Sequence, residues 1–108
     1  MPRVVELHPA VEVEIEDAGL WYEERDAGRG LDFVSAVRTT ILRLTNEQLP
    51  QTRRIVGPGL RDVVRWLPVD GYPHKVIYVD GTPRIVIAVS HDRRHPLYWR
   101  HRAKQSPP

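Results

Sequence analysis

The spacing of apolar residues changes near the middle of the chain, from the period of a helix to the two-residue period of a strand. Before residue 50, apolar side chains recur on one face of two helical segments, and after residue 60 they recur in short runs between turn residues. A helix with a single apolar stripe must bury that stripe against another element. The alternating runs supply that surface, so the chain is restricted to helices packed on a small sheet.

The first half of the chain predicts one strand and two helices. Residues 3–8 are typical of a short strand, which Pro9 ends. One helix follows over residues 9–27 and another over about 31–47, with Gly28-Arg29-Gly30 as the break between them. Because the connection is so short, we expect an antiparallel hairpin. Its apolar faces comprise Val11, Ile15, Ala18 and Tyr22 on the first helix and Val34, Val37, Ile41 and Leu44, flanked by Phe33, on the second.

The second half predicts three further strands, over residues 62–67, 75–79 and 84–89. Pro68 ends the first of them, and Asp80-Gly81 is a strong signal for a hairpin turn between the other two. The expected fold class is therefore α+β, with an antiparallel helical hairpin packed on a small, mainly antiparallel, twisted sheet in the order β-α-α-β-β-β. We expect one domain over residues 1–105 and a frayed tail over 106–108.

Composition narrows the classes of protein that fit. No apolar run reaches the roughly 18 residues of a membrane span, the first residues do not resemble a signal peptide, and cysteine is absent. We therefore expect a cytoplasmic protein with no membrane partner. The charges segregate along the chain: residues 1–50 carry five Arg and ten Asp or Glu, a net of −5, and residues 51–108 carry eleven Lys or Arg and four Asp, a net of +7. Such a split indicates a basic half that meets an anionic partner.

Arginine, histidine and aromatic residues gather where the last predicted strand ends, over residues 90–102. Guanidinium groups bind phosphates and carboxylates in pairs of hydrogen bonds, and flat rings stack on bases or on guanidinium planes. There are two structural alternatives to a binding patch. Tyr98 and Trp99 could instead cover the open end of the sheet, one ring facing inward and the other outward. If the strand continues, Arg93 and Arg94 point in opposite directions and only one of them faces a site.

The same segment contains two histidines at a spacing of four, His91 and His95. Two such histidines chelate a metal ion when they share a helix face, but Pro96 disfavours helical geometry at His95. No third soft ligand is nearby in the sequence. We expect no metal site and no cofactor.

Taken in order, several short motifs resemble one family. They are the acidic first helix that ends in Trp21-Tyr22 and the segments 30–33, 64–68, 71–78 and 88–99. Over nearly its whole length the chain is similar to the RelE/ParE superfamily of type II toxin–antitoxin toxins, also described as plasmid-stabilisation proteins. The resemblance implies a small growth inhibitor that a cognate antitoxin neutralises. We expect the toxin to form either a hetero-oligomer with this antitoxin or a homodimer.

The superfamily includes two activities, and the first is cleavage of mRNA on the ribosome. Such an enzyme activates a ribose hydroxyl, stabilises an anionic phosphate and protonates the leaving oxygen. The candidate catalytic residues for this activity are Arg65, Lys75, His91, Arg93, Arg94 and Tyr98. The resemblance places Arg65, Lys75 and Tyr98 at catalytic positions of RelE-like enzymes. It also places Leu67 where a strand lysine is expected and Asp92 where a catalytic arginine is expected, so the constellation is incomplete.

The second activity is inhibition of DNA gyrase by binding, which needs a surface with anchor residues rather than a catalytic site. The candidate partner-binding residues are Arg93, Arg94, Tyr98, Trp99 and Arg100. The leading hypothesis is a toxin of this kind, with the mRNA endoribonuclease and an inactive toxin homologue as alternatives. Arg65 also has a structural reading, in which it pairs with a helix carboxylate such as Glu16 or Glu23.

Overall fold

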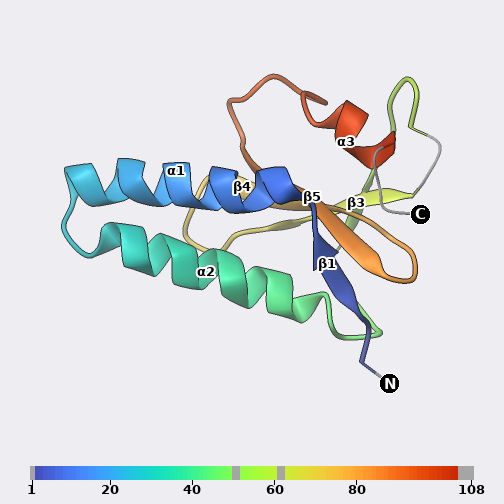
Figure 1. The fold of residues 1–108 in the computed structure, drawn as a ribbon, viewed down its shortest axis with the longest axis horizontal. Helices are drawn as coiled ribbons and strands as arrows, with labels where there is room; N and C mark the ends of the chain where they lie inside the picture. The colour runs from blue at the N-terminus through green and yellow to red at the C-terminus, as the bar shows by residue number, and fades with distance from the viewer. Residues whose placement is uncertain (1, 50–51, 61–62, 105–108) are drawn as a thin grey trace.

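The computed structural model of the chain describes residues 2–49, 52–60 and 63–104 (Figure 1). None of the helices in these ranges has the length and apolar character needed to cross a membrane. The elements in chain order are β1 (Val5–Leu7), α1 (Pro9–Arg25), α2 (Arg29–Arg43), β2 (Arg53–Ile55), β3 (Val64–Pro68), β4 (His74–Val79), β5 (Arg84–His91) and α3 (Arg100–Lys104).

The expected α+β class is confirmed, with the α1–α2 hairpin packed on a mostly antiparallel sheet. The sheet has five strands in the order β1-β5-β4-β3-β2, in which β1 runs parallel to β5 and the other neighbours are antiparallel. Figure 1 shows the two helices side by side and the segment after β5, coloured orange to red, leaving the sheet and ending in α3. The sequence did not predict β2 or α3, which have three and five residues.

Several predicted boundaries also move; α2 already begins at Arg29, inside the predicted break, and β3 includes Pro68, which was expected to end it. The second helix ends at Arg43 and not at Glu47, because the N–H of Leu44 already bonds to the carbonyl of Ile41 in a tighter turn. The last strand continues to His91, two residues beyond its predicted end, because its final residues still pair with β4. The predicted tail over 106–108 lies outside the described residues.

The helical hairpin depends on Gly28, which lies between the helices, and on Gly30, which lies in the first turn of α2. Gly28 precedes α2 with a φ of 87°, a conformation that other residues rarely adopt. The carboxylate of Glu23 accepts hydrogen bonds from the backbone N–H groups of Gly28 and Gly30. A Cβ at Gly30 would lie 2.5 Å from the carbonyl oxygen of Gly19 on α1. The two helices therefore approach each other more closely there than any side chain permits.

The sheet is buried on both faces. Toward the hairpin it contributes Leu67, Val76, Tyr78, Val86 and Val89 to a core with Val11, Ile15, Phe33, Val37, Leu44 and Val69, which follows β3. On the other face Val64, Ile77, Val79, Ile85, Ile87 and Ala88 form a second core with Trp99 and Ala103 of the C-terminal segment. Because both faces are covered, β5 reads as a continuous apolar run rather than an alternating one.

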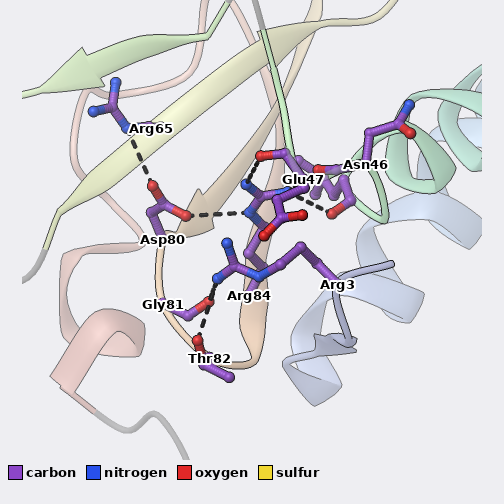
Figure 2. A network of polar contacts seen from close by, with 9 residues as sticks. Arg3, Asn46, Glu47, Arg65, Asp80, Gly81, Thr82 and Arg84 are labelled. Carbon is purple, nitrogen blue, oxygen red and sulfur yellow. Dashed lines mark hydrogen bonds and ion pairs between the residues drawn. The ribbon is translucent and has the colours of Figure 1, made fainter. Parts of the chain in front are cut away.

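The guanidinium of Arg84 joins the end of α2 to the start of β5 (Figure 2). Its side chain donates to the backbone carbonyls of Leu44, Asn46 and Glu47, and its Nε bonds to Asp80 at 3.2 Å. Only 4% of Arg84 is exposed. A buried cation thus satisfies the carbonyl of the C-cap residue Leu44 and two carbonyls of the loop after α2. Its positive charge also suits the negative end of the helix dipole.

We expect Arg84→Met to lower the free energy of unfolding by about 3 kcal/mol, because it leaves buried carbonyl groups without donors while keeping the apolar stem. Urea denaturation followed by circular dichroism measures the loss. Arg54→Met, at an exposed position of β2, is the matched control and should change the free energy of unfolding by less than about 0.5 kcal/mol. Equal losses in the two variants would contradict the structural role of Arg84.

Candidate functional site

The structure divides the candidate catalytic residues between the two faces of the sheet. Arg65 pairs in register with Tyr78, whose side chain lies in the core beneath the hairpin. Lys75 pairs with Pro68 and lies near Trp66, which packs against the second core. Directly paired residues share a face of the sheet. The side chains of Arg65 and Lys75 therefore cannot meet at one concave surface.

Each of these two cations has a carboxylate partner of its own. The Nε of Arg65 lies 3.5 Å from Asp80, which also binds Arg84 (Figure 2). The expected pair of Arg65 with a helix carboxylate such as Glu16 or Glu23 is wrong, because its partner Asp80 lies in the turn between β4 and β5. The Nζ of Lys75 lies 3.3 Å from Asp92 and 4.9 Å from the centre of the Trp66 ring.

The strand does not continue beyond His91, so Arg93 and Arg94 do not alternate across it as they would on a strand. The N–H of Arg93 donates to the Nδ1 of His91, and the N–H of Arg94 bonds to the carbonyl of His91. This tight turn leaves the side chain of Arg93 exposed, whereas Arg94 returns over the ring of Tyr98, with its guanidinium carbon 3.9 Å from the ring centre.

A buried carboxylate that sequence reasoning missed lies at the centre of this cluster. The side chain of Glu14, on α1, is 9% exposed. It accepts hydrogen bonds from the backbone N–H of Val89 at 3.0 Å, from Nη1 of Arg102 at 2.9 Å and from the hydroxyl of Tyr98. Nη1 of Arg94 lies 3.6 Å away. One carboxylate thus connects three side chains of the C-terminal segment, those of Arg94, Tyr98 and Arg102.

The two aromatic residues of the segment take the two orientations that the sequence left open. Trp99 is 3% exposed and packs in the second core, so its ring is a core residue and not part of the surface. Tyr98 is half-buried beside Glu14. Burial, and then the nearby Glu14 carboxylate, raise the pKa of the Tyr98 hydroxyl to about 12, so it remains a proton donor at neutral pH.

A pocket of about 530 Å³ opens beside this cluster, between α1 and the ends of β4 and β5. Its lining is mostly apolar and aromatic, and it also includes Arg94, His91 and the carboxylates of Glu14 and Asp17. A smaller pocket of about 220 Å³ lies on the other face of the sheet, where Lys75, His91 and Arg94 are among the lining residues. These three candidate catalytic residues line one pocket together with Trp99, and Arg94 also contacts the candidate Tyr98.

His74 forms a wall of the larger pocket and is 6% exposed. Its ring packs against Phe33 and against His91, at centroid distances of 4.8 and 4.9 Å, and its Nδ1 has no hydrogen-bond partner among the described residues. Burial, and then the neighbouring His91, lower the pKa of His74 to about 4. The ring is therefore neutral at physiological pH.

Glu14 could have been suspected from its position alone. It lies directly before Ile15 on α1 and three residues after Val11, at the border of the apolar stripe. Within residues 2–49, 52–60 and 63–104, no three histidines or carboxylates gather in a way that could hold a metal ion. Comparisons with family models, with curated proteins and with solved structures found no match to this chain.

We expect acid to destabilise the protein through His74. Above about pH 6.5 the ring is neutral in both the folded and the unfolded chain, and between about pH 6.5 and pH 4 the unfolded chain alone takes up the proton. Stability is therefore lost as the pH falls through this window, by about 2 kcal/mol between about pH 7 and about pH 4.5.

The test compares urea denaturation at these two pH values for the wild type, for His74→Phe and for His95→Gln. The Phe variant keeps an aromatic ring in the core and should lose less stability in acid. His95 is exposed, so its variant should keep the wild-type dependence. An unchanged pH dependence in His74→Phe would show that His74 is not responsible.

Proposed function

We propose that the protein is the toxin of a type II toxin–antitoxin pair and that it stops growth by binding DNA gyrase rather than by cleaving RNA. The toxin part rests on the motifs at residues 21–22, 30–33, 64–68, 71–78 and 88–99, which resemble the RelE/ParE superfamily. The fold, a helical hairpin on a mostly antiparallel sheet, agrees with that resemblance. Fold alone does not choose the target, so the site residues must do so.

We favour binding over cleavage because the candidate catalytic residues do not lie together on one surface. Arg65 and Lys75 occupy opposite faces of the sheet, and they pair with Asp80 and Asp92. Arg94 and Tyr98 are turned toward the carboxylate of Glu14. A scissile phosphate needs several uncompensated donors on one surface. Neutralised cations on two faces do not supply them.

A binding surface remains on the C-terminal segment. Arg93, Arg94 and Arg100 are exposed there, and exposed Leu20 and Trp21 lie on the neighbouring helix α1. Arginine and tryptophan are the residue types that most often carry binding energy at interfaces. Buried Trp99 is left out of this surface, although the sequence suggested it as an anchor.

The same surroundings suit a neutralising antitoxin. An antitoxin tail that folds on binding needs an apolar groove for its energy and charges for its register. The pocket of about 530 Å³ beside Trp21 is such an apolar groove, and the exposed arginines supply the charges that an acidic tail needs. We expect the free toxin to self-associate weakly through the apolar side chains exposed on α1 and α2, among them Leu20, Trp21, Leu31 and Leu42.

The endoribonuclease remains the second candidate because of one observation. Lys75, His91 and Arg94 line the smaller pocket of about 220 Å³. Lysine and arginine bind phosphate, and histidine transfers protons near neutral pH. RNA cleavage would therefore take place at this pocket, without Arg65.

We expect the purified protein to block gyrase from supercoiling relaxed plasmid DNA. The double variant Arg93→Glu with Arg100→Glu should weaken inhibition at least about tenfold, because two exposed cations of the proposed surface change sign. The measurement is the concentration for half-maximal inhibition on agarose gels. Arg53→Glu with Arg54→Glu changes the charge equally on exposed residues of β2 and should inhibit like the wild type.

Supercoiling that is unaffected by excess wild-type protein would refute gyrase as the target. New 5′ ends within codons in a translation extract, abolished by Lys75→Ala with Arg94→Ala, would establish the endoribonuclease instead. Cells that grow normally while expressing the protein without an antitoxin would identify an inactive homologue.

A further inference from the structure

The groups that surround the Glu14 carboxylate have the composition of an oxyanion site. They are two guanidinium groups, one hydroxyl and one backbone N–H, from Arg94, Arg102, Tyr98 and Val89. All four are donors, and arginine forks with backbone N–H groups are the usual ligands of phosphate and carboxylate. The carboxylate that fills the site comes from a distant part of the chain, on α1.

The donors are held in place by contacts that do not involve Glu14. The guanidinium carbon of Arg94 lies 3.9 Å from the centre of the Tyr98 ring, and that of Arg102 lies 5.2 Å from it. Nη1 of Arg102 also donates to the carbonyl of Ile87 at 3.1 Å. Val89 is fixed by its pairing with Val76 in the sheet. These contacts hold the donors in addition to Glu14, so we expect the donor set to survive removal of the carboxylate.

The site also has an entrance. Glu14, Val89 and Arg94 all line the pocket of about 530 Å³, and 54% of the Arg94 side chain is exposed. Truncation of the Glu14 side chain would join its space to this pocket. While Glu14 is present, its negative charge repels a second anion at short range.

We propose that Val89, Arg94, Tyr98 and Arg102 form an oxyanion-binding site that Glu14 keeps occupied in the resting protein. A phosphate or carboxylate group of a partner binds there by displacing Glu14. Only the identity of that partner, gyrase or an acidic antitoxin, rests on the proposed function.

The probe for this site is inorganic phosphate, measured by isothermal titration and by thermal unfolding, against sodium chloride at equal ionic strength. Glu14→Ala should bind phosphate at least about tenfold more tightly than the wild type, and phosphate should raise its midpoint of unfolding more. Glu16→Ala, which removes an exposed carboxylate from the same helix, should behave like the wild type. Adding Arg94→Ala to Glu14→Ala should abolish the gain.

Folded Glu14→Ala that binds phosphate no better than the wild type would overturn the proposal. If that variant folds only in phosphate, the proposal is supported. If it does not fold in either salt, Glu14→Gln decides, because it keeps the shape and removes the charge. A phosphate affinity of Glu14→Gln equal to that of the wild type would overturn the proposal, and a higher one would support it. None of these measurements uses gyrase, so their outcome does not depend on whether the protein inhibits gyrase.

Discussion

The carboxylate of Glu14 determines how the C-terminal segment sits on the rest of the molecule. β1 has only three residues whereas β5 has eight, so β1 covers only the first part of the β5 edge. Beyond it, Glu14 accepts from the N–H of Val89, and Arg102 donates to the carbonyl of Ile87. The ion pair between Glu14 and Arg102 thus replaces a missing strand and connects α1 with the segment that covers the opposite face. An uncovered edge would expose backbone N–H and C=O groups to which a strand of another chain can bind.

The segregation of charge along the chain acquires a different meaning in the fold. The sequence suggests that the basic half is left to meet an anionic partner. In the structure, part of that charge is neutralised within the molecule, since Glu14 of the acidic half faces Arg94 and Arg102 of the basic half. What remains for a partner is a smaller set of exposed arginines. Pairing inside the protein therefore decides which cations of the candidate site can meet a partner.

Local pattern predicted the fold well because the dominant elements have clear apolar stripes or runs. The two helices and the strands β3, β4 and β5 each bury a regular set of apolar residues, and the hairpin turn at Asp80-Gly81 has a distinctive composition. The elements that sequence reasoning missed, β2 and α3, are too short to show a period and depend on tertiary contacts. The same limit applies to the site. Nothing local to residues 90–102 indicates that Glu14, far away in the chain, is the partner of Tyr98 and Arg102.

The parallel pairing of Val5 with Arg84 joins the first strand to the last. Native contacts between such distant parts of a chain form late, because the intervening loop must close before they contribute any stability. During synthesis on the ribosome, the first strand therefore has no strand partner until β5 has emerged. The ion pair between Glu14 and Arg102 forms later still. The surface that carries the C-terminal arginines is consequently assembled only after residue 102 has left the ribosome, so shorter nascent chains do not display it.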